Sequence, residues 1–278
     1  MAGDISYFKR IAAGVRFEYH HGRGTGTLRD TMYGEPEREV REEMKTVMVT
    51  GAAGALGAAV TRLACERGWR VVMIDRDTRG LERVFDAIDE STVGEPILHP
   101  MDLAGVTPDD VEEMLDSVKQ NCGGLDAIVH CAAWFAGLTP LEHFDPAEWL
   151  AHMQVNLNTP WLICARALPL LREADAGKIV FLLEDLEKVS GPLWGAYGVS
   201  KRALATLATQ LAAETRSSGI EVHAVNPGPM RSSIRARVYY AENPQDVPAP
   251  VMAARRIMDY LDGAIDWDEV NVDLSCAG

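Results

Sequence analysis

From Lys45 onward, short runs of β-branched and apolar residues alternate with longer helical patterns along the whole chain. The short runs predict strands at 46–50, 70–75, 96–99, 125–131, 178–183, 220–225 and 269–274. The segments between them predict helices at 56–67, 81–89, 108–121, 146–171 (one or two helices, with a bend at Pro160), 196–217 and 249–261. Regular alternation of strand and helix favours a parallel sheet with helices on both faces. Short connections and right-handed crossovers make it a single doubly wound α/β sheet.

The length allows one large domain, and the beginning of the chain differs from the rest. The chain has 278 residues, of which 47% are hydrophobic, so it can bury a substantial core. Residues 1–44 are polar and end in a charged run. We therefore expect an N-terminal extension at 1–44 and one folded domain at 45–278. The extension is expected either to pack on the surface or to contact a neighbouring subunit or a protein partner.

Charge and cysteine pattern exclude several classes of function. The net charge of −14 argues against nucleic acid and anionic membrane surfaces as partners, because phosphates would be repelled. No run of 18 apolar residues predicts a membrane span, and the first residues lack the apolar core of a signal peptide. The five cysteines are odd in number and have no metal-ligand spacing: Cys65, Cys122, Cys131, Cys164 and Cys276. They predict reduced thiols in a cytoplasmic protein, without a metal site.

A glycine-rich segment, Thr50-Gly51-Ala52-Ala53-Gly54-Ala55-Leu56-Gly57, connects the first predicted strand to the first helix. Glycines permit a tight turn there, and the amino terminus of the helix favours a negatively charged group. The context predicts a turn that binds the pyrophosphate of a dinucleotide, although a tight turn without a ligand would have the same composition.

Three residues beyond this turn bear on the adenosine end of such a ligand. Asp75, at the end of the second strand, can accept hydrogen bonds from ribose hydroxyls and would repel a 2′-phosphate, which favours NAD(H). Arg76 can stack on adenine or pair with a phosphate, so NADP(H) stays possible. Asp102, after the third strand, can accept from the adenine amino group or cap its own loop.

Tyr197 and Lys201 lie four residues apart in the segment Tyr197-Gly198-Val199-Ser200-Lys201, on one face of a predicted helix. An ammonium beside a phenol favours the phenolate, so we expect a lowered pKa for Tyr197. Such a tyrosine can exchange a proton with a substrate near neutral pH.

Taken together, these motifs resemble those of the short-chain dehydrogenase/reductase family over residues 45–275. The segments that carry the resemblance are TGAAGALG, Asp75, VHCAA at 129–133, QVNLNTPW at 154–161, YGVSK at 197–201 and NPGPMRSS at 226–233. The resemblance implies a Rossmann fold of about seven strands in the order 3-2-1-4-5-6-7. It also implies hydride transfer between a nicotinamide and a carbonyl or alcohol.

Roles for individual residues follow from the resemblance. Tyr197 would be the general acid/base, Lys201 would hold the nicotinamide ribose, and Asn156 would bend a helix and support a water relay. The implied cofactor-binding residues are Gly51, Ala53, Gly54, Leu56, Gly57, Asp75, Arg76, Asp102, Leu103, Cys131, Ala132, Ala133, Tyr197, Lys201, Pro227, Gly228, Met230 and Ser232. The helix that carries Tyr197 would also join copies of the chain into a homodimer or homotetramer.

The sequence departs from the family pattern at three places. Thirteen residues before Tyr197, where the family has a serine that donates to the substrate oxygen, stands Glu184. An ionised carboxylate can only accept, and it would repel an oxygen that gains negative charge. The Asn-Ala-Gly element is Cys131-Ala132-Ala133, and the middle glycine of the usual loop is Ala55. A similar glycine loop and a missing serine occur in the dihydropteridine reductase branch.

Two hypotheses of function therefore remain. The first is an NAD(P)-dependent oxidoreductase acting on a small carbonyl, alcohol or related acceptor, such as a quinonoid ring or an imine. The second is a catalytically impaired structural or regulatory subunit that still binds nucleotide, or binds nothing. Substrate specificity is expected in the segments 134–145, 184–194 and 230–247, which are rich in aromatic residues.

Overall fold

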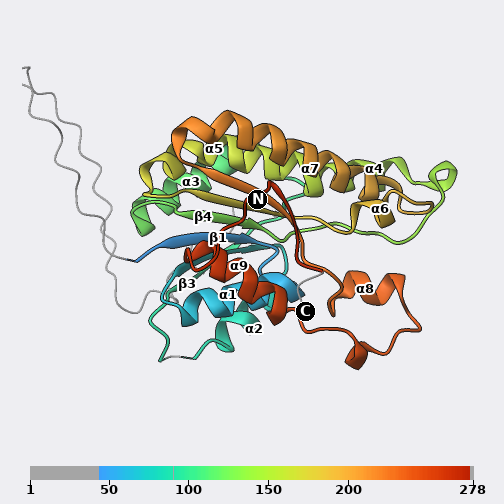
Figure 1. The fold of residues 1–278 in the computed structure, drawn as a ribbon, viewed down its shortest axis with the longest axis horizontal. Helices are drawn as coiled ribbons and strands as arrows, with labels where there is room; N and C mark the ends of the chain where they lie inside the picture. The colour runs from blue at the N-terminus through green and yellow to red at the C-terminus, as the bar shows by residue number, and fades with distance from the viewer. Residues whose placement is uncertain (1–43, 90, 276–278) are drawn as a thin grey trace, which may run out of the picture. The chain divides into compact units, whose positions relative to one another are not determined.

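The computed structural model describes residues 44–89 and 91–275. The predicted extension therefore lies, apart from Met44, outside the described residues, as does Cys276. Seven strands form one parallel sheet in the order β3-β2-β1-β4-β5-β6-β7, which confirms the predicted topology (Figure 1). The strands are β1 (Thr46–Thr50), β2 (Arg70–Asp75), β3 (Pro96–Pro100), β4 (Ala127–His130), β5 (Lys178–Leu182), β6 (Glu221–Asn226) and β7 (Asn271–Asp273).

Helices cover the sheet on both faces. Helices α1 (Ala55–Glu66), α2 (Thr78–Asp86) and α9 (Val251–Leu261) pack on one face, and α3 (Pro108–Cys122), α5 (Thr159–Glu173) and α7 (Gly195–Thr215) pack on the other (Figure 1). Every residue of β1, β4 and β5 is buried, as expected for strands that are covered on both sides. Each face of the sheet has its own hydrophobic core, and successive residues such as Ile128 and Val129 pack into the cores on opposite faces.

Some helix boundaries differ from those predicted. The second helix begins at Thr78 rather than residue 81, because the carboxylate of Asp77 caps it by accepting from the amide of Gly80. The segment 146–171 is α4 (Pro146–Met153), a π-helical turn (Gln154–Asn158) and α5. The end of the predicted helix 196–217 is the 3₁₀ turn Arg216–Ser218. Short helices not predicted from the sequence are α6 (Leu186–Val189), α8 (Ser233–Val238) and the 3₁₀ turns Leu141–His143 and Pro244–Asp246.

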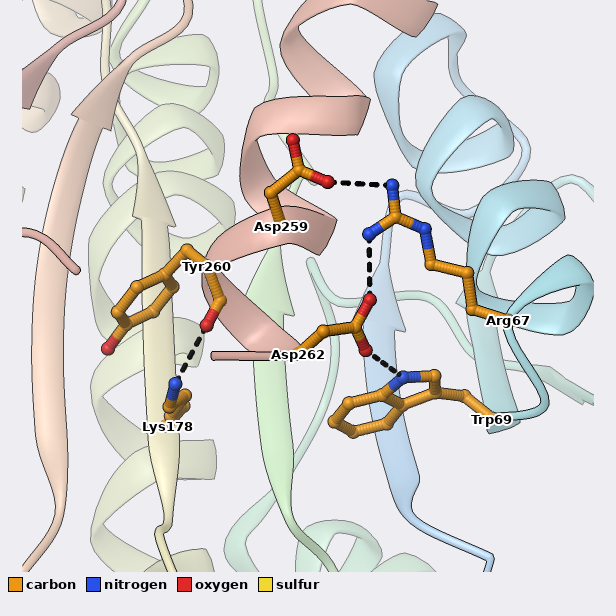
Figure 2. A network of polar contacts seen from close by, with 6 residues as sticks. All are labelled: Arg67, Trp69, Lys178, Asp259, Tyr260 and Asp262. Carbon is orange, nitrogen blue, oxygen red and sulfur yellow. Dashed lines mark hydrogen bonds and ion pairs between the residues drawn. The ribbon is translucent and has the colours of Figure 1, made fainter. Parts of the chain in front are cut away.

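A polar network ties α9 to the amino ends of the strands (Figure 2). Arg67 bridges Asp259 at 2.8 Å and Asp262 at 2.7 Å, and the indole N–H of Trp69, just before β2, donates to Asp262 at 2.8 Å. Lys178, the first residue of β5, donates to the carbonyl oxygen of Tyr260 at 2.7 Å. These contacts fix the end of α9 at the edge of the sheet opposite to the predicted nucleotide turn. Within the described ranges, no helix is long and apolar enough to cross a membrane.

Candidate active site

A pocket opens at the carboxyl ends of the strands and brings together residues from distant parts of the sequence. The predicted site residues that line it are Gly51, Gly54, Leu56, Gly57, Asp75, Arg76, Asp102, Leu103, Cys131, Ala132, Ala133, Glu184, Tyr197, Lys201, Pro227, Met230 and Ser232. The predicted residues Ala53, Asn156 and Gly228 are not part of its lining. Further lining residues, which the motifs did not single out as cofactor-binding, are Ala55, Met101, Trp134, Val155, Leu182, Leu183, Ser233 and Ile234. Trp134, Ser233 and Ile234 lie in segments expected to set substrate specificity, and the others are near neighbours in the chain of predicted residues.

The glycine-rich turn has the geometry that a bound pyrophosphate needs. Gly51 adopts a φ of +69°, and a Cβ there would lie 2.6 Å from the amide nitrogen of Ala132. A Cβ on Gly57 would overlap the carbonyl oxygen of Gly51. No side chain caps the amino terminus of α1, and its first turn holds no acidic residue. The amides in the first turn of α1, from Ala55 to Gly57, are therefore available to an anionic ligand, so the residues present fit a dinucleotide.

The residues expected at the adenosine end make contacts with the protein itself. Asp75 Oδ2 accepts from the amide of Ala53 at 3.1 Å, and Oδ1 accepts from the amide of Asp77 at 3.0 Å. The guanidinium of Arg76 lies 4.3 Å from the ring centroid of Trp134, a cation–π contact. Asp102 Oδ1 accepts from the amide of Ala104 at 3.1 Å, so this carboxylate caps its own loop.

Tyr197 stands in the first turns of α7, with its side chain 1% exposed. The hydroxyl donates to Oε1 of Glu184 at 3.2 Å. Phe135 packs edge-on against the ring at a centroid distance of 5.1 Å, and Trp194 lies 5.9 Å away. A Cβ on Gly198 would overlap the carbonyl oxygen of Val189, so glycine lets α7 approach α6 closely. These contacts fix the phenol beside Glu184.

The expected lowering of the pKa of Tyr197 by Lys201 is wrong for this structure. Burial raises the pKa of Tyr197 well above its usual value, and the charge and hydrogen bond of Glu184 raise it further. The Nζ of Lys201 lies 5.6 Å from the tyrosine ring centroid and donates instead to the carbonyl oxygen of Leu182 at 2.6 Å. Burial also lowers the pKa of Lys201 to about 8.

Asn156 sits in the π-helical turn between α4 and α5 and acts on the backbone around the pocket. Its Oδ1 accepts from the amide of Trp134 at 2.6 Å, and its Nδ2 donates to the carbonyl oxygen of Trp134 and to Ser200 Oγ, each at 3.0 Å. Ser200 Oγ donates in turn to the carbonyl oxygen of Tyr197 at 2.8 Å. Asn156 therefore links the segment after β4 to the helix that carries the tyrosine. The helix irregularity expected at this residue is present, and the water relay stays a prediction.

The three segments expected to set substrate specificity contact one another around the pocket. The amide of Thr139 donates to the carbonyl oxygen of Leu193 at 2.8 Å, and Leu193 has a φ of 76°, a rare conformation for a residue with a side chain. Arg237 donates to the carbonyl oxygen of Phe135 at 2.8 Å. Tyr240, one of the aromatic residues expected in the substrate pocket, is 91% exposed and lies outside its lining.

Comparison with known proteins agrees with this fold. The chain is 28% identical over 219 residues to YciK of Escherichia coli, an uncharacterized oxidoreductase; the match covers 79% of this chain and 86% of the relative. A structure described as a short-chain dehydrogenase from Pseudomonas syringae superimposes with a TM-score of 0.78 at 28% identity, covering 88% of this chain and 99% of that one. Another from Escherichia coli, crystallised with NADPH, has a TM-score of 0.77 at 27% identity and covers 86% and 99%.

The family model for short-chain dehydrogenases matches residues 45–243, which is most of the chain and includes the glycine-rich turn, Glu184, Tyr197 and Lys201. The matched residues include strands β1 to β6 and all of the pocket lining. The chain belongs to the short-chain dehydrogenase family of oxidoreductases.

Proposed function

We propose that this chain is an NAD(P)-dependent oxidoreductase that transfers hydride to or from a small carbonyl, alcohol or related acceptor. The observation that carries the proposal is the shared pocket, because the amino terminus of α1, Lys201 and Tyr197 all line it. An uncapped helix terminus suits a pyrophosphate, and a tyrosine hydroxyl in the same pocket can give or take a proton.

Each group has a defined task in this proposal. A bound nicotinamide dinucleotide supplies the hydride donor or acceptor. The amides at the start of α1 hold the pyrophosphate, and Lys201 holds the nicotinamide ribose through its ammonium group. Tyr197 gives or takes the proton at its phenolic oxygen, which requires that its hydrogen bond to Glu184 opens or reorganises.

The features that bear on the choice between NAD(H) and NADP(H) do not all favour the same cofactor. The carboxylate of Asp75 favours NAD(H), and this choice stays a prediction. The similar structure from Escherichia coli contains NADPH, and Arg76 gives this chain a guanidinium that can bind a 2′-phosphate. Replacing Asp75 with asparagine is expected to improve NADPH binding relative to NADH, measured as a ratio of dissociation constants.

The second hypothesis, a catalytically impaired member with a structural or regulatory role, has one observation in its favour. The hydroxyl of Tyr197 is engaged by Glu184, and its raised pKa opposes phenolate formation.

Assembly of several copies of the chain is compatible with both hypotheses. Trp161 on α5 is 54% exposed and Val199 on α7 is 45% exposed, and we propose that these helices join copies of the chain. Light scattering of the full chain tests this.

Cofactor titration followed by turnover distinguishes the two hypotheses. NADH and NADPH are titrated against the full chain by fluorescence, and at least one is expected to bind. Tyr197→Phe is expected to keep that binding and to lower kcat by about 100-fold or more with any substrate that needs proton transfer. Tyr240→Phe is the matched control, because this tyrosine is exposed and outside the pocket. If neither cofactor binds at millimolar concentration, the hypothesis of an NAD(P)-dependent oxidoreductase is excluded.

A further inference from the structure

Glu184 is a carboxylate fixed inside the substrate side of the pocket. It follows β5 directly, and the amide of Leu183 before it donates to the carbonyl oxygen of Val225 at 2.7 Å. After it, Asp185 caps α6 by accepting from the amides of Glu187 at 3.1 Å and Lys188 at 3.2 Å. The backbone on both sides is thus held, and the side chain is half-buried beside Tyr197. The carboxylate has a defined position relative to the proposed reacting centre.

The positive groups around Glu184 are engaged elsewhere. Lys201 donates to the carbonyl oxygen of Leu182, and Arg235 makes two bonds of 2.6 Å to the carboxylate of Glu242. Both lie close enough to Glu184 for its negative charge to favour their charged forms, which acts to raise the pKa of each. Among the residues that the structure describes, none forms an ion pair with Glu184. Its second oxygen, Oε2, has no hydrogen-bond partner within the described part of the chain, so a ligand can use it.

The pocket lining also holds the aromatic residue Tyr197 and the apolar residue Ile234, alongside Lys201, Ser232 and Ser233. The ring of Trp134 is in contact with the guanidinium of Arg76, so Tyr197 is the aromatic residue in direct contact with Glu184. A carboxylate next to an aromatic side chain is suited to an organic cation, because the charge pairs with the carboxylate and the apolar body of the cation packs on the ring. The same carboxylate disfavours a ketone, whose oxygen gains negative charge during reduction.

We propose that the substrate of this site in the reducing direction is an iminium ion, whose cationic nitrogen is bound by Glu184, and that the substrate in the oxidising direction is the neutral amine. The proposal rests on the proposed function, because the reaction needs the nicotinamide cofactor. The carbon of the iminium C=N bond gains a hydride from the reduced nicotinamide, the π electron pair moves to nitrogen, and a neutral amine forms. The cofactor is oxidised by the same two electrons. No proton is consumed, so the missing serine donor is not needed.

Binding tests the proposal without turnover. N-methylisoquinolinium, a planar permanent cation, is titrated into the full chain saturated with oxidised cofactor, by calorimetry. We expect it to bind, and Glu184→Gln to weaken binding by at least about tenfold, because a charge-assisted contact is lost while the shape is kept. Glu187→Gln is the matched control, since that carboxylate is exposed on α6 and outside the pocket. It is expected to bind as the wild type does.

Turnover provides the second readout. With reduced cofactor, N-methyl-dihydroisoquinolinium is expected to be reduced with a higher kcat/KM than tetralone, a neutral bicyclic ketone. Glu184→Gln should lower the value for the iminium at least about tenfold and should not lower the value for the ketone.

The outcomes separate this inference from the proposed function. Two outcomes would overturn the cationic substrate and leave the oxidoreductase hypothesis intact, provided that the cofactor binds. One is faster reduction of the ketone than of the iminium ion, and the other is equal binding of the cation by wild type and Glu184→Gln. Absence of cofactor binding would overturn both. Absence of cation binding to the cofactor-loaded chain would also overturn the inference, whatever the turnover.

Discussion

The hydroxyl of Tyr197 donates a 3.2 Å hydrogen bond to Oε1 of Glu184, across thirteen residues of sequence. A serine at position 184 would offer a donor to the substrate, whereas the carboxylate accepts from the tyrosine and adds a negative charge. Burial and this carboxylate together hold Tyr197 in its protonated form. The relationship therefore predicts what should happen when position 184 is changed.

Replacing Glu184 with serine is expected to raise reduction of a neutral ketone such as tetralone. The variant supplies a donor to the developing oxyanion, removes a repelling charge and relieves one cause of the raised tyrosine pKa. We expect an increase of about tenfold or more in kcat/KM, measured by oxidation of the reduced cofactor. Glu187→Ser serves as the control. An unchanged ketone rate in Glu184→Ser, while Tyr197→Phe abolishes turnover, would refute this account of Glu184.

Lys201 should make stability depend on pH in the alkaline range. Burial lowers its pKa from 10.5 to about 8 in the folded protein. Below pH 8 the lysine is charged in both states, and its burial destabilises the fold. Between pH 8 and 10.5 the unfolded chain binds more protons, so this lysine's contribution to the free energy of unfolding rises with pH. The whole shift corresponds to about 3 kcal/mol at about 1.4 kcal/mol per pKa unit.

The measurement is a comparison of urea unfolding between wild type and Lys201→Met at pH 7, 8, 9 and 10, without cofactor. The stability of the wild type relative to the variant should rise across this range. A constant difference would show that Lys201 has the same pKa in both states.

Two glycines of the nucleotide turn should differ sharply in their tolerance of alanine. A Cβ on Gly57 would overlap the carbonyl oxygen of Gly51, whereas a Cβ on Gly54 would meet only that same oxygen, at 3.1 Å. Gly57→Ala is expected to destabilise the protein by about 1–3 kcal/mol and to abolish cofactor binding, because α1 must move. Gly54→Ala should cost at most about 1 kcal/mol as a cap change. Urea midpoints and cofactor fluorescence check both, and equal effects would contradict the geometry.

The contacts of Figure 2 predict that Asp259 in α9 and Asp262, which directly follows this helix, contribute unequally to stability. Asp262→Ala removes an ion pair to Arg67 and leaves the indole N–H of Trp69, whose residue is 3% exposed, without its acceptor. Asp259→Ala removes only a partly exposed ion pair. We expect losses of about 1–2 kcal/mol for Asp262→Ala and below about 1 kcal/mol for Asp259→Ala in urea unfolding. Cofactor binding should be unchanged in both, and a larger loss for Asp259→Ala would contradict the prediction.

The fold was largely predictable because its signals are local and repeated. Buried parallel strands appear as apolar runs, and Gly51 and Asp75 fall where a doubly wound sheet needs a turn and a strand end. The helix start at Thr78 was missed because the pattern of apolar residues begins later than the cap at Asp77. The short helix α6 was missed because four residues give too little periodicity to detect.

The site was predictable in membership but not in its electrostatics. The motifs placed Tyr197, Lys201 and Glu184 in one pocket. They could not show that burial outweighs the neighbouring ammonium, which reverses the expected direction of the tyrosine pKa. Nor could they show that Asn156 contacts Trp134 and Ser200, because these hydrogen bonds depend on the packing of segments far apart in sequence.

The polar network of Figure 2 joins the amino ends of the strands, while the pocket opens at their carboxyl ends. The contacts that hold α9 and the pocket therefore lie at opposite ends of the strands of one sheet. A substitution of Glu184 would therefore change the pocket and leave untouched the contacts by which Arg67 and Lys178 hold α9. Substrate choice can change at this position while the opposite edge of the sheet stays as it is.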